Sequence, residues 1–392
     1  MRKVKMGVLL AMLAAFGLLS VSGLGQGDLI QITFQSKWFP QSQFAGYFVA
    51  GGHLPGEAAS GNVPTEGGVD FYAQEGLDVT VLDGGSVNPS VNVAAGNADF
   101  GTDWMANMLV QREAGLDVVH IAQIFQVPAY LFVALKSSGI ESVADFAGKN
   151  VGVWAFGNEF VSEACFAANG LTSDLDETQA SPDISATVYA FDPALVFPNQ
   201  VDAASAMVYN ELDQIVGLGF PLDQLSVISA ASSGCGLLED FIFTTRELLE
   251  SDNYKDTGLS GQEIAERFVR ATVKGWDFAA NNQEQAVKVV LDFCGDTCNG
   301  SGETQSPQIH QAWQMARIAE MVQPSLLTDS AILGLYGFSE TPAAAQIGCL
   351  DMGDYDQTVS LLEEIGLIST GVGDPSKVID TGVMKSMGCP GL

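Results

Sequence analysis

The chain has 392 residues, of which 47% are hydrophobic, and a formal net charge of −31 at pH 7. This acidity argues against nucleic acid and anionic lipid as partners, because both would be repelled by the protein surface. We interpret the charge as that of a solvated surface, in preference to an acidic site for a partner. The length exceeds what one hydrophobic core usually organises, so we expect two lobes.

The N-terminal segment has the three parts of a secretory signal peptide. Basic residues at positions 2, 3 and 5 precede an apolar run at 7–19 and small residues at 20–25. The run is shorter than the roughly 20 residues that a membrane span needs. The first cysteine is Cys165, so no cysteine near the run offers a site for a lipid anchor. We expect residues 1–25 to be removed and the mature chain to be a free, monomeric protein of the periplasm.

Strand patterns alternate with helix patterns along the rest of the chain. The predicted strands span residues 30–34, 77–82, 118–124, 130–135, 151–154, 187–191, 204–208, 225–228 and 241–244, and a further strand end follows residue 97. The predicted helices span residues 87–95, 103–113, 159–169, 211–216, 261–281, 283–293 and 307–322. This alternation indicates an α/β fold with mostly parallel sheets flanked by helices.

The order of the elements predicts two lobes joined by a hinge of two crossings. Residues 28–128 and 240–392 form lobe I, residues 129–239 form lobe II, and the chain crosses near Pro128 and Gly234. Residues 51–69 make a Gly- and Pro-rich loop, which we interpret as mobile. His53 in this loop is expected to be exposed, whereas His120 in a strand and His310 on a helix are expected to be structural.

Polar and aromatic residues follow the predicted strands of lobe I. Trp38, Gln41 and Gln43 come directly after the first strand, and a helix begins near Phe44. Because ligands of open α/β sheets lie outside the carboxyl ends of the strands, these residues are candidates for a ligand site. The alternative for Trp38 is an aromatic residue of the core.

The next two strand ends of lobe I point to the same cleft. Asp103 and Trp104 begin a helix, and Phe125 ends the following strand. The alternatives are a helix cap for Asp103 and a core position for Trp104. With Tyr209 of lobe II, Trp38 and Trp104 would form a slot for a flat heteroaromatic ring.

Lobe II supplies a second set of candidates after its own strands, namely Asn158, Glu159, Tyr209, Asn210 and Glu211. Glu211 is expected to accept hydrogen bonds from a nitrogen-bearing ligand, since a buried carboxylate needs a partner. The alternatives are a helix cap for Asn158 and a helix-start acid for Glu211. Asp240, at the returning crossing, would contact the ligand or order the hinge.

These motifs resemble those of a known family. W-x-P-Q-x-Q-F-A-G-Y-x-V-A (38–50), F-Y-x-x-E-G-L-D-V (71–79), G-x-A-D-F-G (96–101), VGVWAFGNEF (151–160), MVYNEL (207–212) and GLLEDFIF (236–243) are similar, in order, to the NMT1/THI5-like solute-binding proteins. The resemblance implies a type II periplasmic binding protein fold, a small heteroaromatic ligand and an ABC transporter permease as partner. Members of the family carry thiamine pyrimidine precursors or riboflavin, and QFAGY with the Asp103-Trp104 pair favours the riboflavin type.

The same family includes pyrimidine synthases of thiamine biosynthesis, and these offer the alternative of an enzyme. Such synthases hold pyridoxal phosphate on a lysine, near a histidine and a cysteine-rich segment. The corresponding positions here are Asp103, Asn107 and residues 232–236. Without the lysine the Schiff base cannot form, so we expect a binding protein with no cofactor and no catalytic residues.

Six cysteines in an exported chain predict up to three disulfides, with fifteen possible pairings. Cys294 and Cys298 are close enough to close a small loop, and Cys349 with Cys389 could hold the C-terminal tail, which leaves Cys165 and Cys235. No metal site is expected. The CGDTC segment lacks a second pair of zinc ligands, and the acids and amide at 292, 296, 299 and 303 do not have EF-hand spacing.

Overall fold

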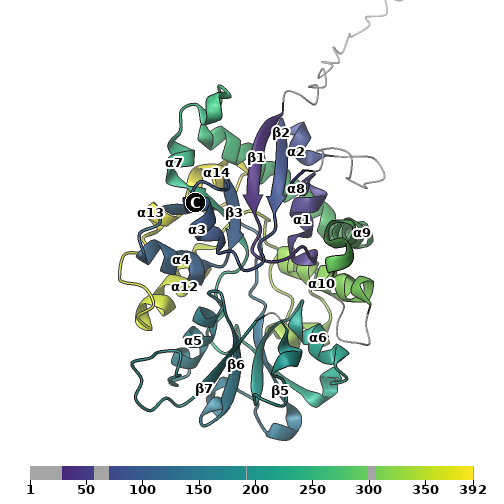
Figure 1. Cartoon of the computed structure of the whole chain (residues 1–392), viewed down its shortest axis with the longest axis vertical. Coiled ribbons are helices and arrows are strands. Elements are labelled where there is room, and N and C mark those ends of the chain that lie inside the picture. Colours follow the sequence, from purple (N-terminus) through teal and green to yellow (C-terminus); the bar gives the residue numbers. More distant parts are fainter. Residues whose placement is uncertain (1–28, 57–69, 191, 299–305, 392) are drawn as a thin grey trace, which may run out of the picture.

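A computed structural model describes residues 29–56, 70–190, 192–298 and 306–391. The predicted signal peptide, most of the 51–69 loop, and Asn299 and Glu303 lie outside the described residues. The chain forms two α/β lobes, one above the other in Figure 1, each built around a five-stranded sheet. All of the predicted strands and helices are present, with ends that shift by at most two residues.

The first sheet has the strand order β2-β1-β3-β10-β4. Its strands are β1 (Ile30–Gln35), β2 (Leu77–Leu82), β3 (Phe100–Asp103), β4 (Val118–Gln123) and β10 (Phe241–Thr245). β1 pairs in parallel with β2 and β3, whereas β10 runs antiparallel to both β3 and β4. β10 therefore returns from the other lobe against the direction of its neighbours.

The second sheet repeats this pattern in the order β7-β6-β8-β5-β9. Its strands are β5 (Tyr130–Leu135), β6 (Asn150–Trp154), β7 (Ser185–Tyr189), β8 (Ala203–Met207) and β9 (Leu225–Ser229). Here β5 is the antiparallel strand, between β8 and β9. In each sheet the antiparallel strand, β10 or β5, is the one that the chain enters directly after a crossing. The other four strands of each sheet run in the same direction, which confirms the prediction of mostly parallel sheets.

Helices cover the sheets and extend the first lobe. They are α1 (Ala45–Val49), α2 (Phe71–Gln74), α3 (Pro89–Ala94), α4 (Met105–Glu113), α5 (Glu159–Ala168), α6 (Glu211–Gly217), α7 (Arg246–Glu250), α8 (Gly261–Asn281), α9 (Gln283–Cys294), α10 (Pro307–Val322), α11 (Ser330–Tyr336), α12 (Met352–Glu364), α13 (Pro375–Val378) and α14 (Thr381–Ser386). α8 and α10 begin where the Ser260 and Ser306 hydroxyls accept hydrogen bonds from the backbone N–H three residues on. The C-terminal segment also contacts the second sheet, where Ser229 Oγ donates to the Tyr336 carbonyl at 2.8 Å. The predicted lobe boundaries remain a prediction.

Close packing of α1 against α8 explains the glycine in QFAGY. A Cβ on Gly46 would lie 2.1 Å from the Trp276 ring, and one on Gly275 would lie 2.2 Å from the Gly46 carbonyl oxygen. Only glycine permits this approach. The contact fixes the helix that follows the Trp38 loop and so holds that loop in place.

Three disulfides join Cys165 to Cys235, Cys294 to Cys298 and Cys349 to Cys389. The sequence offers these three pairs among the fifteen possible pairings without fixing the choice, and the structure forms them. The first disulfide ties α5 to the segment through which the chain returns to the first sheet. The third ties the C-terminal tail to Cys349, next to the residue that bridges to Gln123 of β4.

The prediction for His53 is wrong. Its side chain is only 7% exposed, and its Nε2 lies 2.8 Å from Asp78 Oδ1. The backbone at His53 forms a bridge with Thr80 of β2, so this end of the loop is an extension of the sheet.

Candidate functional site

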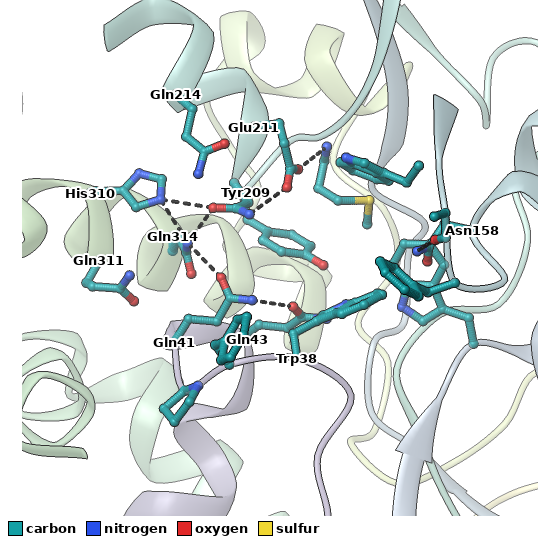
Figure 2. A pocket seen from close by; sticks show the side chains of 18 of the residues that line it. Trp38, Gln41, Gln43, Asn158, Tyr209, Glu211, Gln214, His310, Gln311 and Gln314 are labelled. Carbon is teal, nitrogen blue, oxygen red and sulfur yellow. Dashed lines mark hydrogen bonds between the residues drawn. The ribbon is translucent and has the colours of Figure 1, made fainter. Parts of the chain in front are cut away.

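A cavity of about 780 Å³, counted to its opening, lies between the two sheets at the carboxyl ends of their strands. The lining residues are Trp38, Phe39, Pro40, Gln41, Gln43, Trp104, Trp154, Ala155, Phe156, Asn158, Tyr189, Met207, Tyr209, Asn210, Glu211, Gln214, Thr297, His310, Gln311 and Gln314. Figure 2 shows Gln41, Gln214, Gln311, Gln314 and His310 grouped on one side, and Trp38 extending toward Asn158 on the other.

The wall from the first sheet is held by a buried carboxyl group. Asp240 accepts hydrogen bonds from Trp104 Nε1 at 2.8 Å and from Gln43 Nε2 at 3.0 Å. Burial raises the pKa of Asp240 to about 7, although these bonds and Lys37 lower it. Asp240 itself does not line the cavity, so its observed contacts orient two residues that do.

The wall from the second sheet is formed by the last residues of β6, β7 and β8, namely Trp154, Tyr189 and Met207. Their common position follows from the parallel register of these strands. Trp154 contacts the Tyr189 ring at 6.3 Å between centroids. Across the cavity, Phe156 meets Trp38 edge to face at 6.3 Å.

Glu211 is buried at the start of α6 and already has partners within the chain. Its Oε2 accepts from the Met207 backbone N–H at 3.0 Å, and its Oε1 accepts from Asn210 Nδ2 at 2.6 Å. The carboxyl is therefore hydrogen-bonded without a ligand, and its contact with a ligand remains a prediction. Burial raises the pKa of Glu211 to about 8, so the group is mostly protonated and uncharged near neutral pH.

One face of α10 completes the cavity and bridges to α6. His310 Nδ1 lies 2.7 Å from Asp213 Oδ2, and its Nε2 lies 2.9 Å from Asn210 Oδ1. One turn on, Gln314 Nε2 donates to Asn210 Oδ1 at 2.7 Å and to Gln41 Oε1 at 3.0 Å. His310 was expected to be structural only, and the structure places it in the cavity wall. His120 is fully buried in β4, 3.2 Å from Gln123 Oε1.

Asp103 does not line the cavity, and its buried carboxylate is paired with other side chains of the protein. Lys37 Nζ lies 2.6 Å from Asp103 Oδ1, and both side chains are almost completely buried. Ser90 Oγ and Asn107 Nδ2 donate to Oδ2, each at 2.6 Å. Lys37 immediately precedes the W-x-P-Q motif, and its Nζ is engaged in this ion pair and so is not free to act as a nucleophile. The residues at this position do not fit pyridoxal phosphate.

Three other candidates lie behind the cavity wall. Phe44 is fully buried in the core. Phe125 is also buried and meets the Tyr209 ring edge to face at 6.1 Å. Glu159 Oε2 accepts from the Gly157 backbone N–H at 2.8 Å and so orders the turn before α5. All three are absent from the lining, and Phe125 supports Tyr209, which is part of it.

The remaining candidates, Trp38, Gln41, Gln43, Trp104, Asn158, Tyr209, Asn210 and Glu211, all line the cavity. Sequence reasoning missed Trp154, Tyr189 and Met207, although the strand-end rule that selected Trp38 applies equally to them. It also missed Gln311 and Gln314. On α10 they belong to an ordinary amphipathic helix, and no local pattern marks them.

Comparison with known proteins identifies one family by sequence, two curated relatives by sequence and a set of solved structures by fold. The NMT1/THI5 like family model matches residues 67–286. The chain is 25% identical over 304 residues to the riboflavin-binding protein RibY of Chloroflexus aurantiacus, covering 74% of both proteins. It is 23% identical over 229 residues to 4-amino-5-hydroxymethyl-2-methylpyrimidine phosphate synthase of Legionella pneumophila, covering 56% of this chain and 65% of that protein.

Solved structures share the fold at low sequence identity. The periplasmic aliphatic sulphonate binding protein SsuA of Escherichia coli has a TM-score of 0.55 at 13% identity, covering 90% of this chain and 92% of that one. The periplasmic nitrate-binding protein NrtA of Synechocystis has a TM-score of 0.53 at 12% identity, covering 91% and 88%. The chain therefore has the predicted type II periplasmic binding protein fold. Within the described ranges, the helices are all too short or too polar to cross a membrane.

Proposed function

Because the chain belongs to the NMT1/THI5-like family, we propose that it is a periplasmic solute-binding protein of an ABC importer. It captures a small nitrogen heterocycle in the cavity between its sheets, closes around it by hinge motion and delivers it to a membrane permease. The ligand is a thiamine pyrimidine precursor or riboflavin.

The observation that carries this proposal is the chemistry of the cavity lining. Aromatic rings from both sheets face carboxamides, and none of the lining residues in the described ranges is lysine or arginine. The acid among them, Glu211, is mostly uncharged near neutral pH. Rings offer stacking surface and carboxamides both donate and accept hydrogen bonds, so the cavity suits a flat, neutral, nitrogen-bearing molecule.

The relatives support a heterocycle and leave open which one. RibY is named for riboflavin, and the Legionella relative is named as a pyrimidine phosphate synthase. The ion pair of Lys37 and Asp103 favours binding over catalysis, because it engages the amine that directly precedes Trp38 in the chain. The sulphonate- and nitrate-binding structures support the fold alone.

Calorimetric titration of the purified chain tests the proposal. We expect riboflavin or 4-amino-5-hydroxymethyl-2-methylpyrimidine to bind with a dissociation constant of about 1 μM or below. Ethanesulfonate should not bind measurably, since the lining residues in the part of the chain that the structure describes include no lysine or arginine to pair with it. Ethanesulfonate binding as tightly as either heterocycle would contradict the proposal.

A further inference from the structure

The cavity has two chemically different ends. One, here called the amide end, consists of Gln41, Asn210, Gln214, His310, Gln311 and Gln314. The other, here called the ring end, contains Trp38, Trp154, Phe156 and Asn158. Figure 2 shows the amide-end side chains gathered on the side away from Asn158, with Tyr209 and Glu211 between the two ends.

Two oxygen atoms at the amide end lack hydrogen-bond partners. Gln214 Oε1 and Gln314 Oε1 are both buried and have no hydrogen-bond partner. Gln314 as a whole is only 1% exposed, and the nitrogen of its carboxamide is hydrogen-bonded while the oxygen is not. A buried polar atom without a partner is costly, so these acceptors favour a ligand that brings donors to them.

We infer that the amide end binds the hydroxyl groups of an uncharged polyol chain carried by the ring. A hydroxyl group donates one hydrogen bond and accepts others, which matches a wall of carboxamides and an imidazole. An ionised phosphate only accepts, so it would meet the two unpaired oxygens unfavourably and would find no lysine or arginine in the lining.

The ring end shows the complementary pattern for the edge of a heterocycle. Trp154 Nε1 is a buried donor and Asn158 Oδ1 a buried acceptor, and neither has a partner. A ring edge that presents an N–H and an acceptor satisfies both. Flavin and aminopyrimidine rings share this property, so the ring end alone does not distinguish them. The polyol chain distinguishes the two ligands, because riboflavin would contact both ends of the cavity, whereas a pyrimidine without such a chain would contact only the ring end.

This inference rests on the proposed function and is tested by comparing flavins that differ only in their tails. The probes are riboflavin, lumiflavin, which has a methyl group in place of the polyol, and riboflavin 5′-phosphate. We expect lumiflavin and the phosphate each to bind about tenfold or more weakly than riboflavin, as the loss of one or two hydrogen bonds implies. Equal affinity for riboflavin and lumiflavin, or tighter binding of the phosphate, would overturn the inference.

The variant Gln214→Leu tests the amide end directly. Its Oε1 has no partner, so the substitution removes no observed bond of that oxygen. Riboflavin should bind about threefold to tenfold more weakly to the variant, and lumiflavin affinity should change less than about twofold. The control is Gln224→Leu, the same change at an exposed position outside the lining. An equal loss for both flavins would contradict the polyol assignment.

Failure of this inference is distinguishable from failure of the proposed function. If lumiflavin binds as well as riboflavin, the chain still captures a heterocycle and only the polyol assignment falls. If no flavin binds but the pyrimidine does, the inference is again wrong and the proposed function stands. If neither class binds, the proposed function itself is wrong.

Discussion

Replacing Trp38 with alanine is expected to weaken binding of the heterocycle tenfold or more. Trp38 lies at the cavity wall from the first sheet, and Tyr209 enters from the second, so a planar ring between them would stack on both. Stacking of one base on an aromatic side chain contributes about 1–3 kcal/mol. Burial raises the pKa of Tyr209 well above its usual value, so the phenol stays neutral beside the ring.

Calorimetry on Trp38→Ala and Trp38→Phe provides the test with its control. Phenylalanine retains a ring for stacking, so Trp38→Phe should recover most of the lost affinity. Trp38 is half-buried and also packs against the core, so thermal unfolding of both variants should be recorded in parallel. Unchanged affinity in Trp38→Ala, together with a lower melting temperature, would assign Trp38 to the core.

The second large effect concerns stability of the ligand-free protein in Glu211→Gln. Burial raises the pKa of Glu211 from 4.5 to about 8, so between these values the folded chain retains a proton that the unfolded chain has lost. The stability contribution of this group is therefore complete below about pH 4.5 and is lost as pH rises through about 8. At about 1.36 kcal/mol per pKa unit, the change amounts to roughly 3–5 kcal/mol.

Glutamine cannot ionise, so the variant should escape this loss. Glutamine keeps one acceptor oxygen where Glu211 accepts with two, so urea unfolding should show the variant about 1–3 kcal/mol less stable at pH 5. Between pH 5 and pH 8 the variant should lose less stability than the parent chain. Asp240 also has a raised pKa and remains in both proteins, so some decline with pH persists. Glu284→Gln, at an exposed position on α9, is the control and should shift stability by less than about 0.5 kcal/mol. If Glu211→Gln is much less stable at both pH values, the carboxyl serves chiefly to hold the start of α6.

The sequence predicts the sheets and one half of the site for a single physical reason. Parallel strands end at a common edge, so Trp38 after β1 and Asn158 after β6 are brought to the same cleft by the alternation of elements alone. The same rule reaches Trp154, which ends β6.

The α10 wall depends on tertiary contacts that no local pattern encodes. His310 meets Asp213, which lies 97 residues away in the chain, and Gln314 meets Gln41 at a separation of 273 residues. Asp103 illustrates the opposite case. Its position at a strand end is correct, but its partner Lys37 follows the neighbouring strand β1, and the motifs alone do not show that these two strands are paired.

Mass spectrometry of the small molecules released when the purified protein is denatured tests the central claim most directly. A solute-binding protein that closes around its ligand should retain part of it through purification. We predict an uncharged nitrogen heterocycle, in amounts approaching one per chain and without a covalent adduct on the protein. Release of a sulfonate or another small anion, or a cofactor covalently attached to the chain, would contradict the account.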